Sequence, residues 1–213
     1  MTSLISVEVY MESQCPACID YTATHLAPLV SSLAANIMTL AIYPFGNAEE
    51  TELTDGSYNF TCQHGENECK SNMYEACAIA HYPERLVDLS PAWFQFFACM
   101  EGSTLATDRD PLPYNTSIVE ECARGGGISW DVIDSCAGES PTVGKKDDGN
   151  VIMHAVATAT VKAGKTFCPW VVVDGEALTE EQIDEGDDLS VIVCEAYEKK
   201  NGDVPDCCKT STM

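Results

Sequence analysis

Two cysteines with two residues between them, Cys15 and Cys18, form the first group in the sequence whose spacing suits chemistry. Residues 4–11 before them are rich in β-branched and aromatic side chains, which predicts a strand. Residues 19–33 after them place apolar side chains every three or four positions, which predicts a helix that Pro28 should kink. The pair therefore stands where a strand passes into a helix.

A C-x-x-C pair at such a junction suits thiol–disulfide exchange. Unsatisfied backbone N–H groups and the helix dipole stabilise an anion at a helix N-terminus, so the pKa of the first thiol falls. We therefore predict that Cys15 is the nucleophile and that Cys18, one turn later, attacks the mixed disulfide and releases a reduced product. The alternative is a closed structural bridge in a small loop. The strand before the pair and the amphipathic helix after it favour redox activity.

A proline late in the chain should face this pair. Cys168 and Pro169 precede the apolar run 170–173, which predicts a strand, followed by a turn at 174–175. In thioredoxin-like folds a cis-proline at this place leaves the neighbouring backbone able to bind an extended substrate. We therefore predict that Cys168 and Pro169 contribute to substrate binding. We expect Cys168 to be half of a structural disulfide, and the alternative is a third thiol near the active pair.

An acidic residue stands close to the pair in the sequence, because Glu12 lies three residues before Cys15. If it is ionised and nearby, its charge opposes the thiolate. Its protonation near its ordinary pKa, below about pH 4 to 5, would then help the reaction and supply a proton for the leaving thiol. The alternative is that Glu12 is simply solvated at the end of the strand.

The remaining pattern predicts an α/β protein with a long helical interruption. The apolar run 37–43 predicts a second strand, which gives a right-handed βαβ unit with the first strand and helix. Short helices and loops are expected in the middle of the chain, with a glycine-rich surface excursion at 125–150, and a final helix is expected from 189 to about 201. We predict a thioredoxin-like core formed by residues 1–50 and 166–200. A mainly helical insertion should occupy residues 51–165, and residues 201–213 should form a C-terminal tail.

Charge excludes some classes of partner. Among 213 residues, 11 are Lys or Arg and 34 are Asp or Glu, which gives a formal net charge of −23. Such a field repels phosphate backbones and anionic lipid headgroups, so nucleic acid and membranes are poor candidate partners. No apolar run approaches the roughly 18 residues needed to span a bilayer. We expect a soluble protein.

The twelve cysteines indicate an oxidising compartment. Only one close pair has metal-ligand spacing, so we expect disulfides and neither a metal nor a cofactor. The ten other cysteines allow up to five bridges, and the adjacent Cys207 and Cys208 should not pair with each other. Sequons at Asn59 and Asn115 predict glycosylation in the secretory pathway. A signal peptide is absent from this chain, so we interpret it as a mature form or as a form shortened for expression.

One segment carries a family resemblance. Residues 62–77 match the pattern C-Q-H-G-x2-E-C-x2-N-x4-C, and the chain resembles the gamma-interferon-inducible lysosomal thiol reductase family over roughly residues 7–207. The resemblance implies a thioredoxin-like fold interrupted by a helical insertion. It also implies a reductase that cleaves protein disulfides at acidic pH in an endocytic compartment, with Cys15 and Cys18 as the active pair. We expect Gln63 and His64 to hold a disulfide-linked loop together rather than to react.

The predicted function is therefore that of a thiol oxidoreductase that reduces disulfide-bonded protein substrates, with a small thiol as its reductant. We expect it in a lysosomal, endocytic or vacuolar compartment, or secreted. An oxidase or isomerase is the alternative within the same chemistry, because the direction of electron flow depends on reduction potential. A secreted, disulfide-stapled binding protein without reductase turnover is the alternative of another class.

Overall fold

The structure is a computed structural model that describes residues 2–83, 91–103, 114–138, 148–184 and 188–209. Its larger sheet has four strands in the order β2-β1-β5-β6, which are β1 (Ile5–Met11), β2 (Met38–Pro44), β5 (Trp170–Val173) and β6 (Glu176–Ala177). β1 pairs with β2 in parallel and with β5 antiparallel, and β6 closes a hairpin with β5. The three strands predicted from the sequence are thus confirmed, and so is the βαβ unit.

The crossover between β1 and β2 is a broken helix in four pieces, namely α1 (Pro16–Tyr21), the π-helical η1 (Thr22–Leu26), α2 (Ala27–Ser31) and the 3₁₀ segment η2 (Leu33–Ile37). Pro28 lies in the first turn of α2, directly after the π-helical turn. Proline is tolerated in the first turn of a helix, where the N–H that it lacks is not needed for the helical hydrogen bonds. The predicted interruption at Pro28 therefore takes the form of a change in helix type.

Between β2 and β5 the chain is mainly helical, as the sequence predicts. It contains α3 (Glu66–His81), α4 (Ala92–Glu101), α6 (Thr116–Gly126), α7 (Trp130–Ala137) and α8 (Asp148–Ala163). A two-stranded sheet of β3 (Glu49–Glu52) and β4 (Tyr58–Thr61) precedes them. The sequence analysis missed this hairpin, because β3 is acidic and almost fully exposed and so lacks the apolar alternation of a half-buried strand.

The glycine-rich excursion predicted over residues 125–150 is wrong for the part that the structure describes. α7 lies within it and buries Ile133 and Cys136. Gly149 packs so closely on this helix that an added Cβ would lie 2.4 Å from the carbonyl oxygen of Cys136. The glycine at 149 therefore permits a close approach of two helices, and does not mark a loop. Residues 139–147 lie outside the described part of the chain.

The C-terminal helix α10 (Leu189–Asn201) follows the short α9 (Glu180–Asp184) and ends where the sequence predicts. The Asp188 side chain accepts a hydrogen bond from the backbone N–H of Ser190 at its start, and Gly202 adopts a φ of 80° just after its end. The 3₁₀ segment η3 (Asp206–Cys208) completes the described chain.

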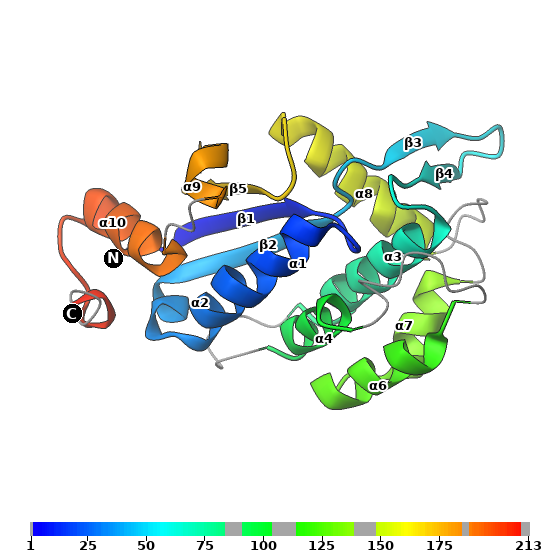
Figure 1. Ribbon diagram of the computed structural model, residues 1–213, viewed down its shortest axis with the longest axis horizontal. Coiled ribbons are helices and arrows are strands. Elements are labelled where there is room, and N and C mark those ends of the chain that lie inside the picture. The colour runs from blue at the N-terminus through cyan, green and yellow to red at the C-terminus, as the bar shows by residue number, and fades with distance from the viewer. Residues whose placement is uncertain (1, 84–90, 104–113, 139–147, 185–187, 210–213) are drawn as a thin grey trace.

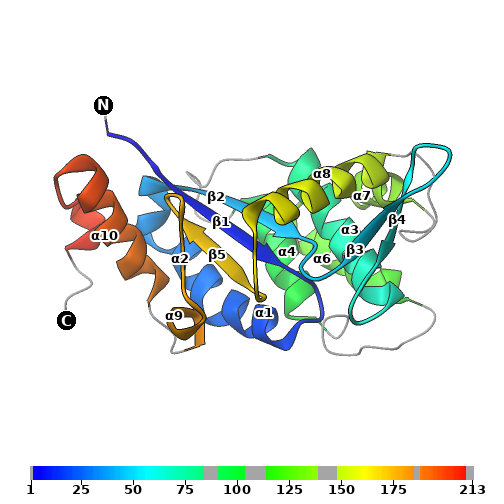
Figure 2. The ribbon, with the colours of Figure 1, turned by 90° about the horizontal axis from the view of Figure 1, so that it is seen from above.

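Two apolar cores lie on either side of α4. Trp93, Phe94 and Phe97 pack with the sheet, α1, α2 and α10, whereas Phe96 and Met100 pack with α3, α6, α7 and α8. Figures 1 and 2 show α3, α4, α6 and α7 grouped beyond one end of the larger sheet, and α10 at the opposite end. The start of α1 lies at the end of β1 that faces the helical group, so the C-x-x-C pair stands between the two parts.

Four disulfides join eight of the twelve cysteines, all of which lie in the described part of the chain. The pairs are Cys62–Cys69, Cys77–Cys136, Cys99–Cys122 and Cys194–Cys208. Since Cys208 pairs with Cys194, the prediction that the two adjacent cysteines do not pair with each other is confirmed. Among the described helices, none combines the length and the apolar character that a membrane crossing requires.

Candidate active site

The C-x-x-C pair lies at the end of β1, as its sequence neighbours predict. Cys15 has extended backbone angles and occupies the N-cap position of α1, and Pro16 follows as the first helical residue. Cys18 is fully buried one turn later, while 8% of Cys15 is exposed. The more exposed thiol is therefore the one at the helix N-terminus, where a thiolate is stabilised.

A third thiol meets this pair. The Cys168–Pro169 peptide is cis and leads into β5, which pairs antiparallel with β1. This pairing brings the Cys168 sulfur to 3.3 Å from that of Cys18. The expectation that Cys168 is half of a structural disulfide is therefore wrong, because the strand pairing aims its side chain at the active pair. Pro169 is buried beside it.

The three thiols differ in acidity. Hydrogen bonds from the thiols of Cys168 and Cys18, together with the backbone N–H groups of Cys18 and Ala17, hold the pKa of Cys15 well below its usual range, against the effect of burial. Burial, more than any other cause, raises the pKa of Cys18. The pKa of Cys168 is also raised, chiefly because its thiol donates to Cys15. In the reduced site the negative charge thus resides on Cys15.

Glu12 is buried at the end of β1, with 1% of its surface exposed. Its Oε2 accepts a hydrogen bond of 2.6 Å from the backbone N–H of Asn47. Gly46, with a φ of 55°, packs so closely that an added Cβ would lie 2.1 Å from the same oxygen. Burial is the main cause that raises the pKa of Glu12 from 4.5 to about 7. The alternative of a solvated side chain is therefore wrong, and so is the expected titration at pH 4 to 5.

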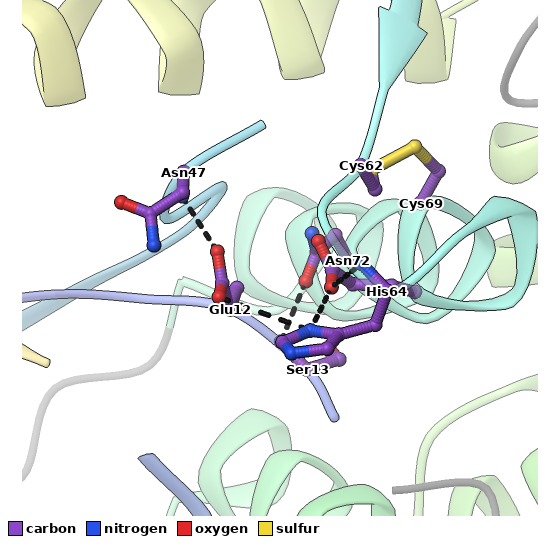
Figure 3. The surroundings of a disulfide bond; sticks show 8 residues. Glu12, Ser13, Asn47, Cys62, His64, Cys69 and Asn72 are labelled. Carbon is purple, nitrogen blue, oxygen red and sulfur yellow. Dashed lines mark hydrogen bonds and ion pairs between the residues drawn. A yellow bond between two sulfur atoms is a disulfide. The ribbon is translucent and has the colours of Figure 1, made fainter. Parts of the chain in front are cut away.

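The loop of the C-Q-H-G signature is closed by the Cys62–Cys69 disulfide and lies against Glu12 (Figure 3). Nδ1 of His64 lies 2.5 Å from a carboxylate oxygen of Glu68, four residues later, and 3.9 Å from one of Glu12. The imidazole thus lies between two buried carboxyl groups from different parts of the chain. Its contacts hold the loop in place, in agreement with the expectation for His64.

Asn47 ties the same loop to two further segments. Its side-chain nitrogen donates to Oε1 of Gln63 over 2.7 Å, and its side-chain oxygen accepts from Nζ of Lys165 over 2.5 Å. Asn47, three residues after the end of β2, therefore joins the signature loop to the segment that leads to Pro169. Gln63, as expected from the sequence, takes part in holding the loop.

Helix α3 holds the segment that precedes Cys15. The backbone N–H of Ser13 donates to Oδ1 of Asn72 and its hydroxyl donates to Oε1 of Glu75, each over 2.8 Å and both buried. Asn72 is the asparagine of the signature. The signature is thus explained in part, because its helix fixes the chain two residues before Cys15.

Behind this contact lies a buried pair of carboxyl groups. Glu75 and Glu101 interact through their charges, and burial is the main cause that raises the pKa of each. The charge of Glu75 raises the pKa of Glu101 further. Two carboxyl groups in this situation titrate as a pair, and one of them keeps a proton at neutral pH.

The sequence analysis missed Asn72, Glu75 and Glu101. The matching pattern over residues 62–77 includes Asn72, but a pattern of residue types assigns no contact. Ser13 lies 59 residues before Asn72 and 62 before Glu75, so no local spacing connects them. Only a sequence signal for long-range contact, such as paired variation in relatives, would have found this group.

These buried carboxyl groups predict that the folded protein is more stable in mild acid than at pH 8. The pKa of Glu12 is about 7 in the fold and ordinarily 4.5, so the folded chain holds this proton more tightly than the unfolded chain does. The stabilisation is complete below about pH 4.5 and is lost as the pH rises through 7. The raised pKa values of Glu75 and Glu101 act in the same direction. Thermal unfolding at pH 5, 6, 7 and 8 should therefore show a falling Tm.

Glu75→Gln is the matched variant, because its amide oxygen still accepts from Ser13. We expect its Tm to depend less on pH than that of the wild type. A wild-type Tm that is constant or rises from pH 5 to pH 8 would contradict the raised pKa values.

Two groups in the described chain each place three potential metal ligands within 4.8 Å of one another, namely the three thiols and the set Glu12, His64 and Glu68. In the first, the raised pKa values of Cys18 and Cys168 oppose the deprotonation that metal binding requires. In the second, the imidazole already contacts Glu68. We assign a metal to neither group.

The two sequon asparagines lie away from the thiols in the sequence. Asn59 is half-buried in β4. Asn115 is exposed at the start of α6, where its side-chain oxygen accepts from the backbone N–H of Ser117 over 3.2 Å. Glycosylation at both positions stays a prediction.

Comparison with known proteins shows which family this chain resembles. The model of the family "Gamma interferon inducible lysosomal thiol reductase (GILT)" matches residues 6–125. A Carassius auratus protein named gamma-interferon-inducible lysosomal thiol reductase is 30% identical over 210 residues, which is 97% of this chain and 72% of that protein. An Arabidopsis thaliana gamma-interferon-responsive lysosomal thiol protein is 29% identical over 207 residues, 97% of this chain and 76% of its own length.

Solved structures show the same fold at low sequence identity. The reduced disulfide bond oxidoreductase DsbG of Mycobacterium tuberculosis superposes with a TM-score of 0.60 and 13% identity, over 98% of this chain and 85% of that one. Reduced DsbA of the same organism gives a TM-score of 0.58 and 16% identity, over 98% and 89%. The predicted thioredoxin-like fold with a helical interruption is thereby confirmed.

Proposed function

Because this chain belongs to the gamma-interferon-inducible lysosomal thiol reductase family and is a thiol oxidoreductase, we propose that it reduces protein disulfides through Cys15 and Cys18 at acidic pH. The observation that carries this proposal is the position of Cys15. It occupies the N-cap position of α1, it is the more exposed member of the pair, and the pKa of its thiol is held well below its usual range. A thiolate so stabilised persists in acid, where an ordinary thiol with a pKa near 8.5 is protonated.

The proposed reaction has two exchange steps. The thiolate of Cys15 attacks one sulfur of a substrate disulfide, and the other substrate sulfur leaves with the electron pair. Cys18 then attacks the Cys15 sulfur of the mixed disulfide, which releases the reduced substrate and leaves a Cys15–Cys18 disulfide. A small external thiol restores the pair. The proton that Cys18 retains because of its raised pKa passes to the departing thiolate.

The backbone around Pro169 is the proposed site for an extended substrate. Its cis peptide lies beside the three thiols, and the preceding residue contacts Cys18. A segment in this position offers backbone groups next to the reacting sulfurs, which suits a disulfide within an unfolded or extended chain. Cys168 would contribute to this site through its backbone.

The proposed compartment is acidic, either lysosomal, endocytic or vacuolar, and secretion is the alternative. The names of the two relatives above include the word lysosomal. The buried carboxyl groups support the proposal, because their raised pKa values favour the folded state in acid. The sequons at Asn59 and Asn115 agree with passage through the secretory pathway.

Two cores support the proposed division of the chain. The sheet core draws on both predicted segments, 1–50 and 166–200, and the second core is centred on the helices of 51–165. We propose these ranges as the thioredoxin-like core and its insertion, with 201–213 as the tail.

A redox titration of the Cys15–Cys18 pair, combined with insulin reduction at pH 4.5 to 7, tests the function. We expect insulin reduction in acid and a potential within the range of dithiol oxidoreductases. A potential far below that of thioredoxin, with no insulin reduction at excess dithiol, would indicate a structural bridge. A strongly oxidising potential with net formation of substrate disulfides would indicate an oxidase.

Glu12 should couple proton binding to the redox state of the pair. The charge of Cys15 is one cause that raises the pKa of Glu12, alongside burial and the charge of Glu68, while His64 lowers it. Formation of the Cys15–Cys18 disulfide removes that charge, so Glu12 binds its proton less tightly in the oxidised enzyme. We therefore expect the reduction potential to fall more steeply between pH 5 and pH 8 in the wild type than in Glu12→Gln.

Between pH 5 and pH 8 the reduction potential of the wild type should fall by about 30 mV more than that of Glu12→Gln for each unit by which the pKa of Glu12 differs between the two redox states. Potentials measured against glutathione at several pH values give the comparison. Glu176→Gln is the matched control, because this carboxylate is exposed and pairs with Lys199. If the potentials of the wild type and Glu12→Gln change with pH in parallel, Glu12 has no electrostatic role in the redox equilibrium.

A further inference from the structure

Three thiols converge at the active pair, although the exchange described above uses two. The sulfur of Cys168 lies 3.3 Å from that of Cys18, and the sulfurs of all three cysteines lie within 4.8 Å of one another. None of the three forms a disulfide, in contrast to the eight paired cysteines of the described chain. We propose that Cys168 is a third redox-active cysteine, which exchanges with the Cys15–Cys18 disulfide to form a Cys18–Cys168 disulfide.

The exchange balances without an external reagent. The Cys168 thiol loses its proton and its sulfur attacks that of Cys18. The Cys15–Cys18 bond breaks, its electron pair leaves on Cys15, and a Cys18–Cys168 bond forms. One disulfide is present before and after, so no electrons enter or leave the protein, and the proton of Cys168 passes to solvent. The inference rests on the proposed function only in so far as turnover supplies the Cys15–Cys18 disulfide.

Geometry and leaving-group chemistry both favour this direction. Cys168 already contacts Cys18, which is the central sulfur of the exchange. Cys15 is the better leaving group, because the pKa of its thiol is held well below its usual range. Its negative charge also raises the pKa of Cys168 in the reduced site, and this obstacle to the thiolate of Cys168 is absent while Cys15 is held in a disulfide.

The exchange changes what the site can do. With Cys18 bound to Cys168, Cys15 is a thiolate that still attacks substrate disulfides but lacks its resolving partner. A mixed disulfide formed in this state persists until an external thiol, or a thiol of the substrate itself, cleaves it. The third cysteine therefore gives one site two modes, a reducing mode and a mode that holds or rearranges substrate disulfides.

The decisive test uses Cys15→Ser, in which Cys18 and Cys168 are the two thiols left at the site. The purified protein is oxidised with diamide in the presence of a chelator, quenched in acid, alkylated and mapped by mass spectrometry. We expect a Cys18–Cys168 disulfide in most molecules, and none in Cys15→Ser/Cys168→Ser. Circular dichroism of each variant checks that it is folded. Retention of both thiols, under conditions that fully oxidise the wild-type pair, would overturn the inference.

The wild-type protein provides the second measurement. After oxidation, we expect alkylation at Cys15 in a fraction of molecules, and we expect that fraction to fall by roughly tenfold or more in Cys168→Ala. Cys207→Ser is the matched control, because Cys207 is a reduced cysteine in η3. It should leave the pattern unchanged.

The two proposals fail separately. Insulin reduction by the wild type without any Cys18–Cys168 disulfide in Cys15→Ser overturns the inference alone. A Cys18–Cys168 disulfide in a protein that reduces no substrate overturns the proposed function alone.

Discussion

Cys15→Ser is expected to lower disulfide reduction to less than about a thousandth of the wild-type rate, because an alcohol cannot form the mixed disulfide with which the reaction begins. The substitution exchanges one small side chain for another at the start of α1, so the fold should persist. Initial rates of insulin reduction at pH 5, with the same concentration of dithiol, measure the effect. Cys207→Ser, which changes a cysteine of η3, should retain the wild-type rate.

The companion variant at Cys18 should trap substrate and not simply fail to bind it. Without the Cys18 thiol the mixed disulfide at Cys15 lacks its resolving partner and accumulates. Because the Cys168 sulfur also lies within 4.8 Å of that of Cys15, trapping should be more complete in Cys18→Ser/Cys168→Ala. Non-reducing electrophoresis shows the covalent complex. A complex that forms with Cys15→Ser but not with Cys18→Ser would reverse the two roles.

Removal of the Cys77–Cys136 disulfide should cause the largest loss of stability among the four bridges. Its partners are 59 residues apart, and the loop-closure relation then gives about 4 kcal/mol. Both sulfurs are buried between α3 and α7, so the double Ala variant also loses packing. Urea unfolding of Cys77→Ala/Cys136→Ala should show a free energy of unfolding lower by about this amount.

The Cys62–Cys69 bridge supplies the comparison. It closes seven residues, so Cys62→Ala/Cys69→Ala should lose only about 2 kcal/mol. Equal losses for the two double variants would show that loop closure in the unfolded chain does not decide the contribution of these bridges.

Local patterns predicted the elements that carry their own signals. The apolar run of β2, the C-x-x-C at the end of β1 and the capped helix α10 each depend on neighbouring residues, and each is found where the sequence places it. β3 was missed because an exposed edge strand does not need an apolar face. α7 was missed because glycines such as Gly149 serve helix contact as well as turns.

The site itself was only partly predictable. Which thiol meets Cys18 depends on the register of β5 on β1, across 150 residues of sequence, and no local pattern encodes that. The pKa of Glu12 depends on its burial against Gly46 and Asn47, which follow the end of β2 and are distant from Glu12 in the sequence. Short-range reasoning therefore placed the C-x-x-C pair at the strand–helix junction but misjudged the residues that surround it.

The two buried hydrogen bonds from Ser13 limit how the helical segment can be removed or replaced. Their acceptors, Asn72 and Glu75, belong to the proposed insertion, while Ser13 belongs to the proposed core and stands two residues before Cys15. Excision of the insertion would leave the Ser13 donors without protein partners and open one side of the reacting loop. The helical segment is thus no removable accessory. A minimal enzyme cut from this chain, or a chimera with a foreign insertion, would have to carry the asparagine and the glutamate with it, so the two parts can be exchanged between proteins only as a matched set.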